Sequence, residues 1–356
     1  MILNICLLPG DGIGPEVTQA VVEVLDAAGP RFGFSVESTS QLIGGAALHA
    51  AGSPLPAATI AAVERAAAVF LGAVGAPEFD REPPARKPET GLLALRQRLG
   101  CWANLRPVRR IAGAGVTPLR EEVVAGADLV VLRELTGGLY FGAPRGFSPT
   151  RDEGFNTLRY SVSEIERLAR FGFELARKRR HHLTSVDKAN VLETSQLWRE
   201  VFVRVGTEYP DVALDHMYVD NCAMQLVLRP RFFDVLATEN LFGDILSDEA
   251  GVLAGSLGLL PSASLGGRVA LYEPVHGSAP DIAGKGWANP IGAILSAALM
   301  LRHSFNLEPA AAAIEQAVER TLQAGTLGRD LVPAGAPFAT TDEITSAVAA
   351  SLDGTD

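Results

Sequence analysis

Short apolar runs alternate with amphipathic stretches along most of the chain. The apolar runs have the length and composition of buried strands, and they cover residues 2–8, 67–72, 128–132, 183–186, 213–219 and 233–238. Segments with helical spacing lie between and after them, at 15–28, 56–65, 89–99, 163–180, 194–208, 288–303 and 307–324. This alternation favours an α/β fold with a mostly parallel sheet. Ser163 and Glu166 have the spacing of a capping box at the start of one helix.

A predicted helix at 240–251 carries two carboxylates four residues apart, Asp244 and Asp248. Positions i and i+4 lie on one helix face, so both side chains point to the same place. Two converging carboxylates repel each other unless a cation lies between them, and oxygen ligands suit Mg²⁺ or Mn²⁺. Asp220 is a third acid, at the end of a predicted strand. The alternative is a solvated helix face that carries two acids.

Three arginines, Arg96, Arg106 and Arg133, lie at the ends of predicted elements, where ligands gather in α/β proteins. Guanidinium groups bind carboxylates through two parallel hydrogen bonds, so three arginines indicate a substrate with two carboxylates. In an arginine-rich chain, each one taken singly is also consistent with an ordinary surface residue.

Two residues are candidates for acid–base chemistry. Lys188 follows the apolar strand 183–186, where burial or a neighbouring cation can lower the pKa of its ammonium group. Tyr140 lies in 134–151, a segment rich in Gly, Pro and aromatic residues that we expect to form an extended arm or hairpin. The alternatives are an exposed lysine at a strand end and a tyrosine that only packs.

Two segments are candidates for nucleotide binding. Residues 9–17 (PGDGIGPEV) follow the first strand but lack the Gly-x-Gly-x-x-Gly spacing, so we interpret them as a tight strand-to-helix turn near a ligand. A Rossmann site with Glu37 as the ribose-binding acid is the alternative. Residues 273–284 form a polar loop of small residues with His276 and Asp281, whose backbone N–H groups can approach an adenine and its phosphates.

The composition narrows the class of protein. A chain of 356 residues is long enough for about two domains, and 47% hydrophobic with 20% charged residues is ordinary for a soluble globular protein. A net charge of −10 disfavours a nucleic-acid-binding protein. The three cysteines, Cys6, Cys101 and Cys222, lie far apart, and we interpret them as reduced thiols in a cytoplasmic protein. The sequence shows neither a long apolar run nor an N-terminal signal pattern.

Taken in order, eight segments resemble the β-decarboxylating dehydrogenases, the family of isocitrate and isopropylmalate dehydrogenases. They are LPGDGIGPEV, PETGLLALR, ANLRP, RELTGGLYFG, DKANVLETS, YVDNCAMQL, NLFGDILSDEAG and EPVHGSAPDIAGKGWANP. The resemblance extends from Leu7 to about Asp330, nearly the whole chain. Such a series in one order is hard to obtain by chance, unlike any single segment.

The resemblance implies a non-Rossmann α/β fold of two domains with a cleft between them. Residues 1–101 and 256–356 would form a terminal NAD-binding domain. Residues 102–255 would form a central dimerisation and metal/substrate domain, with an intersubunit arm near 138–160. The implied activity is NAD-dependent, Mg²⁺- or Mn²⁺-dependent oxidative decarboxylation of 3-isopropylmalate to 4-methyl-2-oxopentanoate in leucine biosynthesis, by a cytoplasmic homodimer with shared active sites.

The resemblance also implies roles for individual residues. Tyr140 and Lys188 would be the acid–base pair, and Lys188 and Asp220 would reach the partner subunit's site. The malate carboxylates would bind Arg96, Arg106 and Arg133, and the metal would bind Asp220, Asp244 and Asp248. NAD would contact His276, Gly277, Ser278, Ala279, Asp281, Ile282 and Asn289.

The C3 substituent of the substrate decides between members of the family. Glu89, Leu92 and Leu93 open the helix that carries Arg96, and with Val191 they are expected to line a pocket suited to a branched alkyl group. Cys101 and Trp102 precede the segment ANLRP, where the family usually has smaller or less polarisable residues. One alternative is therefore a sister enzyme acting on D-malate, tartrate, homoisocitrate, isocitrate or another 3-alkylmalate. Two others are disfavoured: a catalytically silent regulatory subunit, because no key residue is missing, and an all-helical Mg²⁺–diphosphate enzyme, because strands recur throughout.

Overall fold

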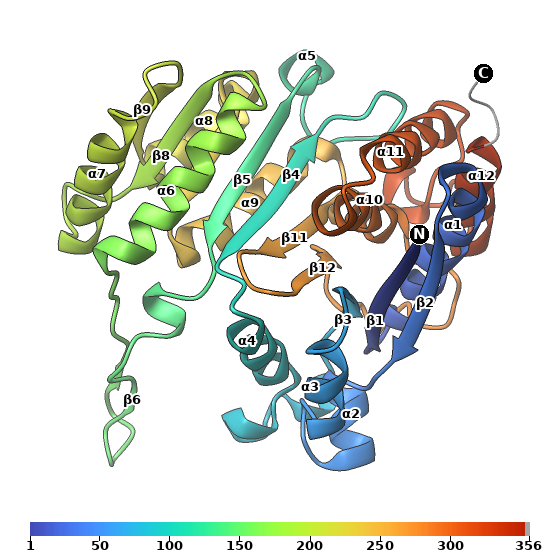
Figure 1. Ribbon diagram of the computed structural model, residues 1–356, viewed down its shortest axis with the longest axis horizontal. Coiled ribbons are helices and arrows are strands. Elements are labelled where there is room, and N and C mark those ends of the chain that lie inside the picture. The colour runs from blue at the N-terminus through green and yellow to red at the C-terminus, as the bar shows by residue number, and fades with distance from the viewer. Residues whose placement is uncertain (353–356) are drawn as a thin grey trace. The chain divides into compact units, whose positions relative to one another are not determined.

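The computed structural model describes residues 1–352, and it divides into two compact units (Figure 1). Unit 1 comprises Met1–Cys101, Ile111–Pro118 and the chain from Ala254 onward. Unit 2 comprises Trp102–Arg110 and Leu119–Leu253. Each unit contains five of the longer strands and its own set of helices.

In unit 1 the strands follow the order β2-β1-β3-β12-β11. β1 (Ile2–Gly10) pairs in parallel with β2 (Ser35–Ser40) and β3 (Ala68–Ala73). β12 (Ala270–Pro274) is parallel to β3 but antiparallel to β11 (Pro261–Leu265). The α-helices are α1 (Gly14–Phe32), α2 (Gly44–Ala51), α3 (Ala57–Val63), α4 (Pro88–Leu99), α10 (Ile291–Phe305), α11 (Glu308–Gln323) and α12 (Thr341–Ser351).

The core of unit 1 forms around β3 and α10. Every residue of β3 is buried, as expected of a strand covered on both faces. α10 is apolar on nearly every side, and it contacts β11, β12, α1 and α11. Helices α1 and α10 thus pack against the strands of unit 1.

In unit 2 the strands follow the order β4-β5-β10-β8-β9. β4 (Ala103–Arg109) is antiparallel to β5 (Asp128–Glu134), whereas β5, β10 (Val235–Thr238), β8 (His182–Asp187) and β9 (Ala213–Tyr218) are parallel. Five α-helices belong to this part of the chain: α5 (Glu121–Val124), α6 (Val162–Arg177), α7 (Glu193–Gly206), α8 (Val219–Leu228) and α9 (Asn240–Ala254). β6 (Gly146–Phe147) and β7 (Gly154–Phe155) form the predicted hairpin, which projects from unit 2 (Figure 1).

Most of the predicted elements are confirmed, and the strand pairings are mostly parallel as predicted, with antiparallel pairing of β11 with β12 and of β4 with β5. The segment around Asn104–Pro107 was not predicted as a strand, because its polar and apolar residues do not read as a buried run. It forms β4, whose polar residues Asn104 and Arg106 are buried because they face a polar cluster described below. The helices α2, α5, α8 and α12 were not predicted either.

The predicted capping box at Ser163 and Glu166 is wrong. The box that forms is Ser161 with Glu164, where the Ser161 N–H donates to Glu164 Oε2 at 2.7 Å. Glu166 binds Arg170 and Arg204 instead. Both serine–glutamate pairs have the same spacing, so the sequence alone does not decide at which serine the helix begins.

Residues Ile111–Pro118 belong to unit 1, whereas the predicted boundaries put them in the central segment. The Val116 N–H donates to the Leu331 carbonyl at 3.1 Å. Gly115 lies so close to the same carbonyl that a Cβ there would be 2.0 Å from the oxygen, and its φ of +67° also favours glycine. The cleft, the NAD-binding role and the dimerisation role assigned to the two segments stay predictions.

Two further expectations concern the chain's environment. Within residues 1–352, no helix has both the length and the apolar character needed to cross a membrane. Cys6, Cys101 and Cys222 are buried free thiols, and burial raises the pKa of the Cys6 and Cys101 thiols to about 11. Thiols in this protonated form are poor nucleophiles.

Candidate active site

Helix α9 presents three polar side chains at four-residue intervals, Asn240, Asp244 and Asp248. The spacing places them in one row along the helix. Asn240 is fully buried, whereas the Asp248 side chain is 58% exposed, so the row runs from the interior of unit 2 to its surface. The predicted pairing of the two aspartates on one helix face is therefore observed.

Two buried arginines lie along this row. Arg133 donates from Nε and Nη2 to Asn240 Oδ1, at 3.0 and 2.7 Å, and from Nη1 to Asp244 Oδ1. Arg106 Nη1 donates to Asp248 Oδ1 at 3.3 Å and lies 3.6 Å from Asp244 Oδ1. The exposed fractions of the two arginines are only 2% and 8%. Each guanidinium thus contacts two neighbouring members of this row. Arg133 contacts Asn240 and Asp244, and Arg106 contacts Asp244 and Asp248.

Strand pairing puts the two arginines on the same face. Arg133 on β5 is opposite Asn104 on the antiparallel strand β4. Arg106 is two residues from Asn104, so its side chain points to the same side of the sheet. Asn104 Oδ1 accepts a hydrogen bond from Arg106 Nε at 3.0 Å, which orients that guanidinium. The expectation that these arginines end their elements is wrong for Arg106, which lies inside β4.

Tyr140 belongs to the same cluster. Its hydroxyl donates to Asp244 Oδ2 at 2.7 Å, and the Arg133 guanidinium lies 5.6 Å from its ring centroid. Burial and the hydrogen bond to Asp244 raise the pKa of Tyr140 to about 12. The phenol therefore stays protonated near neutral pH and is available as a proton donor.

Lys188 and Asp220 form a separate pair in unit 2. β8 and β9 are parallel, with Asp187 opposite Tyr218, so the residues that follow both strands emerge at the same edge. Lys188 Nζ donates to Asp220 Oδ1 at 2.7 Å, and this hydrogen bond lowers the pKa of the Asp220 carboxyl group. Asp220 lies in the first turn of α8.

The α9 carboxylates fit a hard divalent cation. Their donors are oxygens only, the ligands that Mg²⁺ and Mn²⁺ prefer. Burial raises the pKa of Asp248, and the charge of Asp244 raises it further, against the opposing effect of Arg106. A cation between the two would remove this repulsion. Within the described part of one chain, however, no three acidic, His or Cys side chains come together as a metal site, so Asp220 does not join Asp244 and Asp248.

In unit 1, Arg96 lies on α4 and is almost buried. Its Nη2 atom donates to Glu273 Oε1 at 2.6 Å, and Glu273 is buried as well. The Arg96 Nε atom is buried without a hydrogen-bond partner among the residues described. An unused buried donor of this kind suits a ligand that brings an acceptor.

The residues predicted to meet the C3 substituent belong to different parts of the chain. Leu92 and Leu93 are partly buried on α4, and Leu92 packs against the core of unit 1. Glu89 is exposed on the same helix, and Val191 is exposed in unit 2. Trp102 packs edge-on against Phe171 of α6, with ring centroids 5.9 Å apart. The apolar pocket itself stays a prediction.

The turn after β1 packs against the loop predicted to bind NAD. The Ile13 N–H donates to the Ser278 carbonyl at 2.8 Å. Gly12 has a φ of +56°, and a Cβ there would lie 2.0 Å from the same oxygen. Residues 9–17 therefore form the predicted tight turn. The Rossmann alternative is not supported, because Glu37 is an exposed residue of the edge strand β2 and Gly12 packs against protein.

The loop after β12 contains an acceptor that suits a nucleotide. His276 Nδ1 lies 3.0 Å from the Gly277 carbonyl, and within residues 1–352 its buried Nε2 has no hydrogen-bond partner. Burial lowers the pKa of this imidazole, which favours the neutral ring. If Nδ1 donates to the carbonyl, Nε2 is an acceptor, and an adenine amino group is a donor that matches it. Ala279 has a φ of +38°, a strained conformation often found at ligand sites.

The remaining residues predicted to contact NAD extend from this loop to α10. Gly277 and Asp281 are exposed, and Ser278 is buried. Asn289 Oδ1 accepts from the Ile291 N–H at 3.1 Å, at the start of α10, and its Nδ2 donates to Asp330 Oδ2 at the same distance. All of these residues lie in unit 1. Their contact with a cofactor stays a prediction.

Several residues that hold these side chains in place were not predicted from the sequence. Asn240 is four residues before Asp244, so the helical spacing that singled out the aspartates also reaches it. The sequence indicated Asn104 less clearly, only through its position two residues before Arg106. Tyr160, Glu273 and Asp330 had none, because each is distant in sequence from the group that it contacts, and the same holds for the contact of Glu239 with Tyr160.

Comparisons with known proteins agree with this arrangement. Residues 4–348 match the family described as isocitrate/isopropylmalate dehydrogenase. A 3-isopropylmalate dehydrogenase from Gloeobacter violaceus is 57% identical over 338 residues, which cover 94% of this chain and 93% of that protein. One from Aquifex aeolicus is 53% identical over 353 residues, covering 98% and 97%.

The solved isocitrate dehydrogenase from Methylococcus capsulatus is similar in structure, with a TM-score of 0.88 and 38% identity over 98% of this chain and 99% of that one. The resemblance found in the eight sequence segments is thus confirmed along nearly the full length. This chain belongs to the isocitrate/isopropylmalate dehydrogenase family and is a β-decarboxylating dehydrogenase.

Proposed function

We propose that the enzyme oxidises and decarboxylates 3-isopropylmalate to 4-methyl-2-oxopentanoate with NAD⁺, a step of leucine biosynthesis. Relatives named 3-isopropylmalate dehydrogenase that are 53% to 57% identical over almost the whole chain support this substrate. The structural observation that carries the proposal is the α9 row, where Asp244 contacts both Arg133 and Tyr140.

Arg106 and Arg133 are proposed to bind the malate carboxylates. Both are buried and oriented by asparagine side chains, so their planar forks are already fixed before a ligand arrives. Preorganised donors lose little conformational entropy on binding. Arg96 is proposed as a third carboxylate-binding residue, since its Nε atom is an unused buried donor in the described structure.

Asp244 and Asp248, with Asp220 of the partner subunit, are proposed to hold Mg²⁺ or Mn²⁺. The metal would supply Lewis-acid polarisation of the C2 oxygen, and NAD⁺ would accept the hydride from C2. Lys188, also of the partner subunit, takes the proton of the C2 hydroxyl, directly or through a water. After CO₂ leaves, Tyr140 donates its proton to C3, and its raised pKa keeps it in the protonated form that this step requires.

The cofactor is proposed to be NAD, bound by the loop after β12 and by Asn289. His276 Nε2 offers an acceptor to the adenine, and Gly277 leaves open space for it, since a Cβ at Gly277 would meet nothing within 4 Å. Asp281 and Ile282, with Ser278 and Ala279, complete the proposed contacts. A carboxylate at Asp281 suits a ribose with free hydroxyl groups.

A homodimer is proposed from the surface of unit 2. Large apolar side chains are exposed on α8 and α9, namely Met224, Val227, Leu228, Ile245 and Val252. Phe147 and Phe155 are exposed on the hairpin. Exposed apolar groups of this number mark an interaction surface. We also propose a cytoplasmic location, in which the three free cysteines stay reduced.

A substrate panel tests the proposed activity. The isopropyl group has three carbons, each worth about 0.8 kcal/mol when buried, so a small apolar pocket should favour it over malate by roughly 1–3 kcal/mol. Among 3-isopropylmalate, D-malate, isocitrate and homoisocitrate, the catalytic efficiency should therefore be highest for 3-isopropylmalate. A substrate without an alkyl branch that gave the highest value would refute the assignment. Leu92→Ser with Leu93→Ser should narrow the preference over malate, and an unchanged ratio would exclude those two residues from the pocket.

A further inference from the structure

The Asn240 side chain joins three parts of unit 2. Its Oδ1 atom accepts two hydrogen bonds from Arg133 on β5, and its Nδ2 atom donates to the Gly137 carbonyl at 3.0 Å. Gly137 directly precedes the short 3-10 helix Gly138–Tyr140 that carries the proposed acid. One amide thus contacts both a proposed carboxylate-binding residue and the segment that positions the proton donor.

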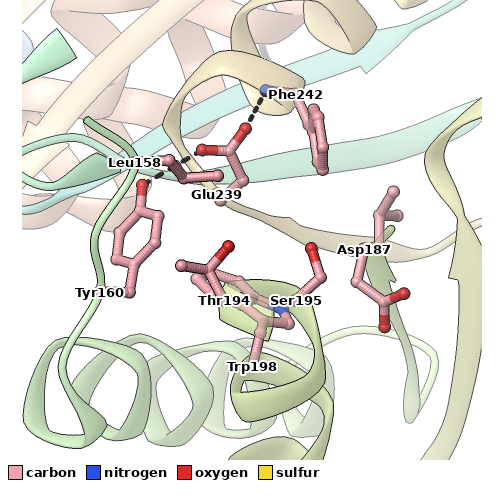
Figure 2. A pocket seen from close by; sticks show the side chains of 9 residues that line it. Leu158, Tyr160, Asp187, Thr194, Ser195, Trp198, Glu239 and Phe242 are labelled. Carbon is pink, nitrogen blue, oxygen red and sulfur yellow. Dashed lines mark hydrogen bonds between the residues drawn. The ribbon is translucent and has the colours of Figure 1, made fainter. Parts of the chain in front are cut away.

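The backbone of Asn240 is itself fixed. Its N–H donates to the Tyr160 hydroxyl at 3.0 Å, and the same hydroxyl is 3.4 Å from Glu239 Oε2. Glu239 Oε1 accepts from the Phe242 N–H at 2.7 Å, in the first turn of α9 (Figure 2). The cavity beside these groups has a volume of only about 10 Å³, enough for about one water molecule. These hydrogen bonds hold the start of α9 against Tyr160.

A glycine at position 243 leaves space for the Arg133 side chain to reach Asn240. Gly243, one turn further along α9, has no side chain, and a Cβ there would lie 2.7 Å from Arg133 Cγ and 2.3 Å from Thr238 Oγ1. A glycine inside a helix reduces helix stability by roughly 0.5–1 kcal/mol relative to alanine. Its presence at this position allows the arginine to lie along the helix.

We propose that Asn240 is a positioning residue for catalysis, which sets both the Arg133 guanidinium and the Gly137–Tyr140 segment against Asp244. The proposal rests on the proposed function, because it assumes that Arg133 binds a substrate carboxylate and that Tyr140 protonates C3. The amide supplies the acceptor and the donor together, on two separate atoms and without a charge. A carboxylate in its place would keep the acceptor for Arg133, neutralise that arginine and lose the donor to Gly137.

The test uses two variants: Asn240→Ala removes both contacts, and Asn240→Asp keeps an acceptor for Arg133 but removes the donor to Gly137. The first readout is KM and kcat for 3-isopropylmalate. The second is the exchange of the C3 hydrogens of 4-methyl-2-oxopentanoate with D₂O, followed by ¹H NMR with Mg²⁺ and NADH present. This exchange is the reverse of the proposed Tyr140 step and involves no hydride transfer. Tyr140→Phe calibrates it: if exchange persists in Tyr140→Phe, the proposed role of Tyr140 fails, and the Asn240 assignment is then judged on KM alone.

Both Asn240 variants should raise KM and slow the exchange by about tenfold or more, the loss expected when a hydrogen bond to a charged or tightly fixed group is removed. The matched control is Asn104→Ala, which removes an equally buried amide that accepts from Arg106 instead. It should raise KM while C3 exchange stays close to the wild-type rate.

Thermal unfolding identifies a variant that fails to fold. If Asn240→Ala is unfolded at assay temperature, the isosteric Asn240→Asp decides. A folded Asn240 variant with wild-type KM and wild-type exchange would overturn the proposal. So would equal losses of exchange in the Asn240 and Asn104 variants, since that result indicates only a shared structural role.

Discussion

At the scale of residues, the candidate site is a set of opposite charges that pair with one another. Asp244 accepts from Arg133 and from Tyr140, and Asp248 accepts from Arg106. A cation and a dicarboxylate brought together would replace these contacts with equivalent ones, carboxylates to the metal and arginines to the substrate. The charges of the site are thus suited to binding both ligands together.

Asp244→Asn tests the metal at this scale. The amide removes one negative charge from the α9 row, and it is a weaker ligand for Mg²⁺ than a carboxylate. The Mg²⁺ concentration that gives half-maximal activity should rise by roughly tenfold or more, and kcat should fall. The measurement is a Mg²⁺ titration of EDTA-treated enzyme. Full activity of the metal-free wild-type enzyme would show that the row does not need a cation.

Asp281 tests the choice of cofactor. A carboxylate that binds the ribose hydroxyls repels the 2′-phosphate of NADP⁺, so we expect a strong preference for NAD⁺ in kcat/KM. Asp281→Asn should reduce that preference by weakening the repulsion, and Glu37→Gln, at an exposed position of β2, should leave it unchanged. Comparable efficiencies with both cofactors in the wild-type enzyme would show that Asp281 has been assigned wrongly.

At the scale of elements, α9 is the helix on which the site depends, and a buried acid, Glu239, directly precedes its first residue. Burial raises the pKa of Glu239 above its ordinary value of 4.5, against the lowering effect of the Phe242 and Leu241 N–H groups. A folded-state pKa above the unfolded value means that the folded protein binds more protons between the two. This contribution to stability is present below about pH 4.5 and is lost as the pH rises through the folded-state pKa.

Glu239→Gln removes that titration and keeps an acceptor for the Phe242 N–H. The melting temperature of the wild type, relative to that of this variant, should therefore fall as the pH rises from about 4.5. Glu343→Gln is a control of opposite sign, because hydrogen bonds from Thr340 lower the pKa of that exposed carboxyl group. Melting curves across pH 4 to about 8 check both slopes. A wild-type and Glu239→Gln pair with parallel curves would contradict the prediction.

At the scale of the whole molecule, the proposed metal site is incomplete in one chain. Lys188 and Asp220 pair with each other, and within residues 1–352 no third acid joins Asp244 and Asp248. If a partner subunit supplies Lys188 and Asp220, each site of a symmetric dimer contains residues from both chains.

Mixed dimers test this arrangement. Tyr140→Phe and Lys188→Ala homodimers should both be inactive or nearly so. A purified heterodimer of the two variants should regain about half of the wild-type activity, because one of its two sites has neither substitution. A heterodimer of Lys188→Ala with Asp220→Ala is the control, and it should stay inactive because both of its sites carry a substitution. Recovery in the control, or none in the test heterodimer, would exclude sites shared in this way.

The sequence by itself determined the features that depend on local spacing. The apolar runs predict the strands, and the four-residue interval puts Asp244 and Asp248 on one helix face because the period of a helix is a local property. The order of the eight segments was enough to identify the family. Local rules were insufficient where two sites satisfied them equally, as with the two serine–glutamate pairs at the start of α6.

The tertiary structure alone decided which distant groups meet. Arg133 contacts Asn240, 107 residues away, and Arg106 contacts Ser247, 141 residues away, because β4 pairs with β5 and α9 packs near both arginines. The antiparallel pairing of β4 and β5, which sets the face on which these arginines lie, leaves no periodic signal in either strand. Spacing inside an element fixes the direction of a side chain, whereas the pairing and packing of elements fix its partner, and only folding of the whole chain determines that partner.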